Sequence, residues 1–373
     1  MSPSPGRALG RSPRPDALQV VLVAVAALGF ASAVIGLGLG GSGVRPGGDV
    51  TVHDRQAVVT PRAPVRSIEL VARVPLPGPP TGLAVGRTRV GVSMALKGLM
   101  LLRRDDAHLA RRLRFDGIAT SIVPDGRGFW FADLMHDRAV RVAEDGSVDP
   151  RFRVGGLPGG IVLTRSDVWV LGIEQPSVTI GDRRNGLPVV HLTFHPGDLW
   201  PGAITYGPHG VWLVTGHKTA VTLMDPELLV TRGRIQLRGG RLLAATPQGV
   251  WVARHGPGAE LVRVDGASLA AHPVRLPRQS LVTAMDAGSI LAVAVRGGIL
   301  ALDPRSGALR ARGPVAPGRE LTHVVVDGDR IWAVDASHNE LLRFRVRPLK
   351  DSLPEPARQA ASSGASAGAQ TVP

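Results

Sequence analysis

The sequence predicts an all-β fold, a seven-bladed β-propeller preceded by one N-terminal transmembrane helix. An apolar segment that usually carries Trp recurs at near-regular spacing, turn residues divide each repeat into four short strands, and one long apolar run lies near the N-terminus. Gly and Pro contribute 47 and 31 of the 373 residues, more than a helical protein carries. This content suits a fold with many tight turns.

The long apolar run covers residues 17–39, where Gln19 and Ser32 are the only polar side chains. As a helix it would extend about 34 Å, enough to cross a bilayer core of about 30 Å. Three arginines within residues 1–16 favour a cytoplasmic N-terminus, with the propeller outside the cell membrane. The alternative is a secreted protein, cleaved at the A-x-A motif of residues 31–33. We expect an uncleaved signal anchor, because the apolar run continues beyond that motif.

The recurring segment has Trp at its second position in five copies, at Trp130, Trp169, Trp212, Trp251 and Trp332. Two degenerate copies place Gly91 and Leu291 in the same frame, and successive copies lie 39 to 43 residues apart. Four antiparallel strands in about 40 residues make one propeller blade. Breaks with Gly or Pro every 8–12 residues or so leave no room for the helices of a helical repeat. We expect the tryptophans to pack between blades.

A ring of blades must close, because an open ring leaves the last blade with an unpaired edge. No fourth strand follows Val346, whereas residues 67–74 form a spare strand before the first repeat. We therefore expect this strand to become the outermost strand of blade seven. The resulting organisation is a cytoplasmic N-terminus (1–16), a transmembrane helix (17–39), a flexible stalk (40–66), the propeller (67–347) and a disordered tail (348–373).

The amino-acid composition excludes several kinds of functional site. The chain has no Cys, which excludes disulfides, thiolate metal sites and a cysteine nucleophile. The net charge of +14 comes almost wholly from arginine and leaves two interpretations open: an anionic partner, or a generally basic surface. One Tyr and seven Phe provide few stacking surfaces for bases, so we expect no nucleic-acid partner.

The stretch from Trp200 to Trp212, WPGAITYGPHGVW, and the stretch 123–133, VPDGRGFWFAD, resemble the repeats of virginiamycin B (streptogramin) lyases and of NHL-like propellers. The resemblance extends over the predicted propeller, 67–347, and implies the propeller fold. For the lyases it further implies a His, a nearby carboxylate and a magnesium ion, which open a cyclic depsipeptide by elimination.

Lyase repeats commonly carry an acidic residue three positions after the Trp. In this sequence only Asp133 and Asp335 match that position, whereas Gly172, Thr215 and Arg254 depart from it. These departures weigh against both the metal and the lyase activity.

In a propeller, the loops between second and third strands line one mouth of the central channel, together with the connections between blades. In this sequence they supply a mostly cationic ring of candidate ligand-binding residues: Lys97, His136, Glu174, His217, Lys218, Arg254, His255, Arg296 and His338. Such a ring could hold an anionic ligand. Alternatively, His136, His217, His255 or His338 could act as a general base beside Asp133, Asp335 or Glu174. A third interpretation is that these are ordinary polar loop tips.

These observations favour a membrane-anchored, extracytoplasmic binding or scaffold module for a protein or an anionic envelope component. The alternative is a lyase or lactone-hydrolase-type enzyme with a His general base and a divalent metal. No cofactor or metal is expected otherwise, and magnesium enters only under that alternative.

Overall fold

The computed structural model describes residues 57–58 and 66–347, except for 116, 127, 175, 195–202, 217–218, 255–259 and 277–280. The predicted cytoplasmic N-terminus, transmembrane helix and tail lie outside these residues, as does most of the predicted stalk. The chain divides into two compact units, Met1–Gly48 and Asp49–Pro373, and the description below concerns the second. No helix in the described part of the chain is long and apolar enough to cross a membrane.

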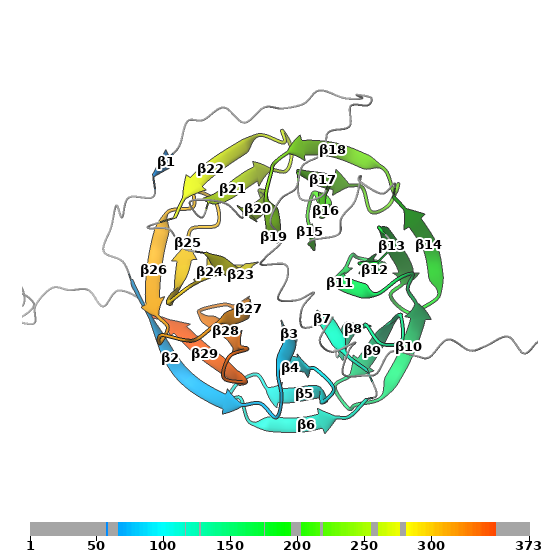
Figure 1. Cartoon of the computed structure of the whole chain (residues 1–373), viewed down its shortest axis with the longest axis horizontal. Coiled ribbons are helices and arrows are strands. Elements are labelled where there is room, and N and C mark those ends of the chain that lie inside the picture. Colours follow the sequence, from blue (N-terminus) through cyan, green and yellow to red (C-terminus); the bar gives the residue numbers. More distant parts are fainter. Residues whose placement is uncertain are drawn as a thin grey trace, which may run out of the picture. The chain divides into compact units, whose positions relative to one another are not determined.

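Within the described residues, the strands form seven four-stranded antiparallel blades arranged in a ring (Figure 1). Blades one and two contain β3 (Pro80–Val85), β4 (Arg89–Met94), β5 (Gly98–Arg103), β6 (Leu109–Leu113), β7 (Ala119–Asp125), β8 (Gly128–Asp133), β9 (Arg138–Ala143) and β10 (Val148–Arg153). Blades three and four contain β11 (Pro158–Leu163), β12 (Asp167–Gly172), β13 (Ser177–Asp182), β14 (Pro188–Thr193), β15 (Ile204–Gly207), β16 (Gly210–Thr215), β17 (Ala220–Met224) and β18 (Thr231–Gln236).

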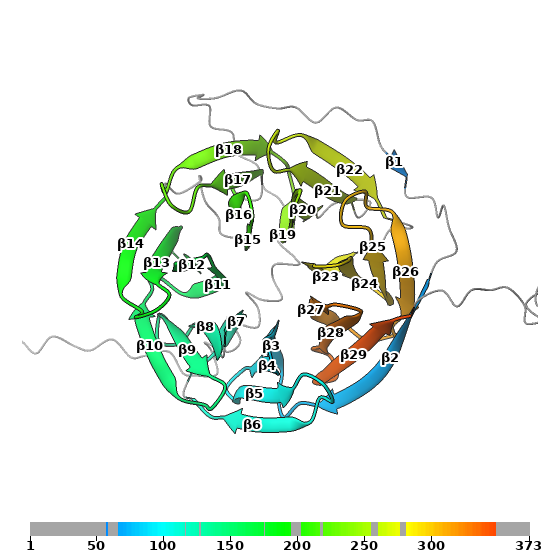
Figure 2. The same cartoon turned by 180° about the vertical axis from the view of Figure 1, so that it is seen from behind.

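Blades five and six contain β19 (Gly240–Thr246), β20 (Gly249–Arg254), β21 (Glu260–Asp265), β22 (Ala271–Arg275), β23 (Val282–Ala287), β24 (Leu291–Val295), β25 (Gly298–Leu302) and β26 (Leu309–Pro314). Blade seven combines β27 (Leu321–Asp327), β28 (Arg330–Asp335) and β29 (Glu340–Val346) with β2 (Arg66–Pro75). In every blade the first strand lies nearest the centre of the ring, and the fourth forms the outer wall (Figure 2).

Strand β2 closes the ring, as predicted. It pairs antiparallel with β29, so that Ile68 lies opposite Val346 and Pro75 lies opposite Glu340. At its start, Arg66 and Ser67 also pair in parallel with β26 of blade six. Segments from the two ends of the propeller therefore complete one blade and join it to its neighbour.

A second contact of the N-terminal segment is not predicted by the sequence pattern. Ala57–Val58, within the predicted stalk, forms β1 and pairs in parallel with Val274 and Arg275 on the outer edge of blade five. The segment before the propeller therefore touches the outer strands of blades five and six before it enters blade seven.

The five periodic tryptophans are fully buried, and each packs against the next blade, which confirms their predicted role. Trp130 clusters with Val168 and Val170 of blade three, and Trp332 clusters with Val90 and Val92 of blade one. Trp169, Trp212 and Trp251 make the same contact with blades four, five and six. Burial of an indole at five of the seven junctions contributes strongly to the cohesion between blades.

The two blades without Trp use other residues at this position. In blade one, Phe129 of blade two fills the space above Gly91, where an added Cβ would lie 3.2 Å from the ring. In blade six the strand register places Ala292, not the predicted Leu291, at the Trp position: Ala292 lies opposite Ala301, as Trp251 lies opposite Arg263. The frame predicted for blade six was therefore displaced by one residue.

Replacing Trp212 with Ala should lower the free energy of unfolding by about 3–5 kcal/mol, because the buried indole leaves a cavity between blades four and five. Urea unfolding monitored by far-UV circular dichroism checks this. Leu228→Ala, at a side chain that is 70% exposed, is the matched control and should change stability by less than about 0.5 kcal/mol. Equal effects of the two substitutions would contradict the packing described here.

Candidate functional site

The predicted mouth residues that the structure describes lie in, or directly beside, the loops between the second and third strands of the blades. These loops share one end of the ring with the connections between blades, because each blade is an antiparallel meander. The described members are Lys97, His136, Glu174, Arg254, Arg296 and His338. His217, Lys218 and His255 are predicted for the same end and lie outside the described residues.

In blade two, the structure brings His136 to Asp133. Asp133 is the last residue of β8 and is fully buried, whereas His136 stands in the exposed loop that follows. The Nδ1 atom of His136 lies 2.9 Å from Oδ2 of Asp133, and Arg138 donates to the same oxygen through Nε at 2.8 Å. The other carboxylate oxygen, Oδ1, is buried without a hydrogen-bond partner among the described residues.

Blade seven repeats this pairing at the same place in the repeat. Asp335 ends β28 and is fully buried, and its Oδ2 lies 3.0 Å from Nδ1 of His338. Arg319, from the connection between blades six and seven, donates to Asp335 Oδ2 at 2.7 Å and to Glu340 Oε2 at 2.5 Å. Ser337 donates to Oδ1 through both its backbone N–H, at 3.1 Å, and its hydroxyl, at 2.5 Å.

These contacts set the charge state of Asp335. Burial by itself would raise the pKa of this carboxyl group, but the hydrogen bonds from Ser337 and from the Glu320 N–H, with the charges of His338 and Arg319, outweigh it. The pKa of Asp335 is therefore lowered, and the group is a carboxylate at neutral pH. The pKa of Arg319 is raised, mainly by its hydrogen bond to Glu340.

A carboxylate that holds an imidazole through Nδ1 can orient it as a general base. The structure provides this pairing twice, in blades two and seven, which blade one separates. Both carboxylates also bind an arginine, so each pair is part of a larger ion-pair network. The Asp–His pairing is a feature of catalytic sites, whereas the added arginine is typical of an ion-pair network that holds a loop in place.

The residues present do not fit the magnesium ion that the lyase resemblance implies. Magnesium requires several oxygen ligands in near-octahedral geometry. Near Asp335, the guanidinium group of Arg319 lies between the two carboxylates that could supply them. Near Asp133, Arg138 binds one oxygen. No group of three or more His, Asp or Glu side chains in the described part of the chain could hold a metal ion.

Arg138 and Arg319 belong to this site, although the sequence interpretation did not include them. Arg138 begins the third strand two residues after His136, and Arg319 lies in a connection between blades. Reading those connections in the same frame as the loops would have found Arg319 and its neighbour Glu320. Burial lowers the pKa of Arg241 on β19, and the negative charge of Glu320 offsets part of this shift.

The inner strand of blade seven also carries a partly buried histidine. His323 lies on β27, and burial lowers its pKa to about 4, so its imidazole is neutral at physiological pH. On the neighbouring inner strand β23, burial raises the pKa of Asp286 to about 6, although the Val326 N–H donates to its Oδ2 at 2.7 Å. Asp286 lies opposite Ala292, the residue at the Trp position of blade six. Its hydrogen bond with Val326 links blades six and seven.

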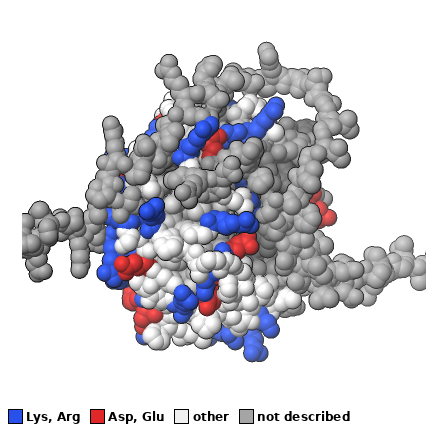
Figure 3. Space-filling model, turned by 60° about the vertical axis from the view of Figure 1, so that its left-hand side comes forward, with Lys and Arg blue, Asp and Glu red and all other residues white. Residues whose placement is uncertain are grey.

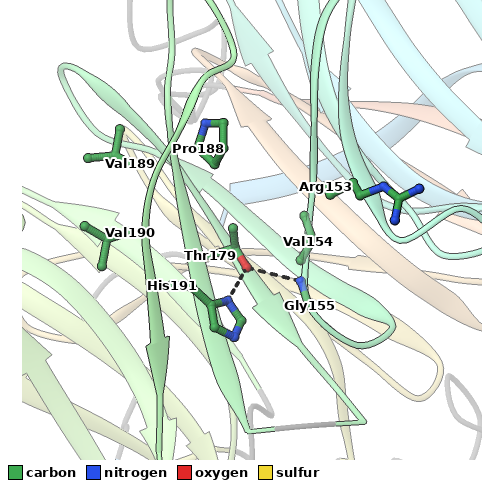
Figure 4. Close-up of a pocket in the computed structure, with 8 residues that line it drawn as sticks. All are labelled: Arg153, Val154, Gly155, Thr179, Pro188, Val189, Val190 and His191. Atoms are coloured by element: carbon green, nitrogen blue, oxygen red, sulfur yellow. Dashed lines mark hydrogen bonds between the residues drawn. The ribbon is translucent and has the colours of Figure 1, made fainter.

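A separate concavity of about 430 Å³ lies between blades two and three, away from the predicted residues (Figure 4). Thr179 on β13 lies at its base: its Oγ1 is 3.0 Å from Nδ1 of His191 and accepts the Gly155 N–H at 3.3 Å. The hollow is shallow and open, and none of the candidate mouth residues lines it.

Comparisons with known proteins support the fold alone. No family model and no curated protein sequence matches the chain. Among solved structures, similarity is found to BamB from Moraxella catarrhalis, with 13% identity, 74% of this chain and 99% of that chain covered, and a TM-score of 0.54. The β-propeller domain of Cps50 (Swd1) from Myceliophteria thermophila is 14% identical, with 75% and 100% covered and a TM-score of 0.63. The WD40 domain of Pan2 from Neurospora crassa is also 14% identical, with 77% and 97% covered and a TM-score of 0.62.

Asp335→Asn should lower the free energy of unfolding at pH 7 by about 3 kcal/mol, because Arg319 then loses its fully buried carboxylate partner and keeps only the partly exposed Glu340. Since folding lowers the pKa of Asp335, its contribution is complete above the unfolded-state value of about 3.9 and is lost as the pH falls through the folded-state value. The difference from wild type should therefore shrink below about pH 4. Thermal unfolding across this pH range measures it.

Asp329→Asn provides the matched control. This carboxylate is 65% exposed, and its contact with Arg345 is long, at 3.7 Å. It should cost less than about 0.5 kcal/mol at every pH. A pH-independent loss in Asp335→Asn, or an equal loss in the control, would contradict the assignment.

Proposed function

We propose that this protein is a binding module, anchored to the membrane by residues 17–39, that captures an anionic partner at the end of the propeller formed by the strand 2–3 loops. The partner is an acidic protein surface or an anionic polymer of the cell envelope. Propellers with unrelated sequences share this architecture and differ in their loops, so the proposal depends on the loop chemistry rather than on the fold.

The supporting observation is the state of the charges at this end. The described carboxylates of the Asp–His networks and of the Arg254–Glu260 pair are all engaged by arginine. By contrast, four exposed cations in the described loops and connections at this end have no ion-pair partner among the described residues: Lys97, Arg114, Arg238 and Arg296. The exposed carboxylates described in the loops at this end are Asp137, Glu174 and Glu320. Exposed loop cations therefore outnumber exposed loop carboxylates at this end by a small margin.

Basic side chains also occur elsewhere on the molecule. On the face seen in Figure 3 they are spread among acidic groups rather than gathered in one patch. A general positive charge speeds the encounter with anions but does not select a site. The test of the proposal must therefore compare the loop end with another basic part of the same surface.

The double variant Lys97→Glu with Arg296→Glu should weaken binding to poly(glycerol phosphate) or poly-L-glutamate by about tenfold, which corresponds to about 1.4 kcal/mol. Both side chains are exposed, so the fold should persist. Fluorescence anisotropy with the full chain in detergent measures the affinity at two salt concentrations, because an electrostatic complex weakens as salt rises. The two polyanions distinguish a polymer partner from an acidic protein.

The matched control is Arg87→Glu with Arg184→Glu, the same charge change on exposed turns at the opposite end of the ring. It should leave affinity within about twofold of wild type, since these charges lie roughly a blade length away. Equal losses in the two double variants would mean that binding follows net charge only, and the proposed site would then be wrong.

The proposed anchor predicts that the full chain stays in the membrane pellet after alkaline carbonate washing, whereas a chain lacking residues 1–39 is released. Apolar segments of this length insert stably because each backbone polar group is satisfied within the helix. N-terminal sequencing of the membrane form should find residues before 17. A mature protein that begins near residue 34 would instead indicate cleavage and secretion.

A further inference from the structure

The outer edges of the blades differ in whether another strand covers them. Strand β1 pairs in parallel with β22 of blade five, and β2 pairs with β26, so that blades six and seven form one eight-stranded sheet. The addition of extended chain to an outer edge is therefore a contact that this fold already uses. In blades one to four, β6, β10, β14 and β18 each end a four-stranded sheet, and no described strand continues it.

Three of these four open edges are protected by charge. Each of β6, β10 and β18 carries two exposed arginines: Arg111 and Arg112, Arg151 and Arg153, and Arg232 and Arg234. Charged side chains on an edge strand discourage pairing with another chain. Strand β14, with the sequence PVVHLT, has no Lys, Arg, Asp or Glu. Its Pro188 lacks an N–H only at the first position of the strand, so most of this edge is unprotected.

The surface of β14 is apolar as well as uncharged. Val189 is 58% exposed, and Leu187, in the turn directly before the strand, is 62% exposed. Val189 also lines the concavity of about 430 Å³, together with Val190 of the same strand and Val154 of blade two (Figure 4). In strand addition, backbone hydrogen bonds hold the incoming segment while alternate side chains enter neighbouring hollows. The edge of β14 offers both features.

The backbone of β14 presents free hydrogen-bonding groups on this edge. Phe194 N donates to Pro176 O, beside β13, at 2.9 Å, and from there the ladder continues back along β14 to Val190 without a shift in register. In such a ladder, alternate residues direct their N–H and C=O groups to opposite sides of the strand. His191 and Thr193 therefore direct theirs away from β13, where an extended segment can pair with them.

The charges around the edge select an acidic partner. Arg153 is the one Lys, Arg, Asp or Glu among the described residues that line the concavity. It is exposed and has no ion-pair partner in the described part of the chain. A second copy of the chain would bring a further net charge of +14 to this surface, and long-range repulsion opposes that encounter. A segment with an apolar centre and acidic ends matches both the uncharged strand and the arginine beside it.

We infer that the outer edge of β14 is a docking site for an extended segment of a partner protein, which adds a further strand to blade three. The segment is apolar where it lies along Val189 and acidic where it meets Arg153. This site does not depend on the proposed binding end of the propeller, because it uses the outer wall of one blade rather than the strand 2–3 loops.

A labelled peptide tests the inference with the full chain in detergent. The probe is a blocked, fluorescein-labelled peptide with a Val-Thr-Val-Thr-Val centre and Glu-Glu at each end, and fluorescence anisotropy measures its affinity. The control peptide has the same ends and Pro at alternate central positions, which removes backbone N–H groups needed for strand pairing. It should bind about tenfold more weakly. Equal binding of the two peptides, or no saturable binding of the probe to folded wild type, would overturn the inference.

Thr193→Pro should weaken binding of the probe about tenfold, because it removes an outward N–H and leaves the bond from Phe194 N in place. Gln236→Pro is the matched control at the same register position of β18, where Leu237 N likewise donates to Thr219 O. It should leave the affinity within about twofold of wild type, since it alters a different edge. Equal losses in the two variants would contradict a site on β14.

If Thr193→Pro does not fold, Arg153→Glu provides a second test on an exposed side chain. It should weaken the probe about fivefold and leave unchanged the affinity of a peptide with Gln in place of every Glu. An unchanged affinity for the probe would overturn the acidic partner. Sedimentation velocity of the full chain tests the other occupant: a dimer that Thr193→Pro or Arg153→Glu converts to monomer would assign the edge to a second copy instead.

Discussion

The pairing of β2 with β29 is the contact on which the whole structure depends. Each blade is stabilised mainly by the blades on either side, since the buried Trp of one blade packs on the second strand of the next. Blades one and seven bury their facing surfaces only if they are in contact, so the ring must be closed. Blade seven takes its outer strand from residues 66–75, and Trp332 of the same blade packs on blade one. Closure therefore fixes the mouth, because the Asp335 network lies in the blade that the two chain ends share.

The repeat pattern was sufficient to predict the four-stranded blades, the closing strand and the inter-blade tryptophans, since each is a local periodic signal. It failed where that signal was weakest. Blade six has no Trp, and its frame was displaced by one residue, because an apolar run without an aromatic marker fits two registers equally well. The contact of Ala57–Val58 with β22 was also missed, since two residues pairing with a distant strand leave no periodic trace.

The candidate site could be predicted only in part, for a related reason. Asp133 with His136, and Asp335 with His338, lie three residues apart, so chain proximity alone brings each pair together. Arg319 reaches Asp335 from the connection between blades six and seven, 16 residues earlier in the chain, so proximity in the sequence does not indicate it. The repeat pattern therefore predicts the blades, but it does not predict contacts between side chains that lie far apart in the sequence.

Ring closure can be measured directly, because the chain has no native cysteine. Glu69 and Arg345 face each other across β2 and β29; Arg345 is exposed and Glu69 is half-buried. The variant Glu69→Cys with Arg345→Cys should form an intramolecular disulfide under mild oxidation and migrate faster on a non-reducing gel. Glu69→Cys with Ser268→Cys, which lies on blade five, should not. Cross-linking of the second pair but not the first would contradict closure of the ring by the N-terminal strand.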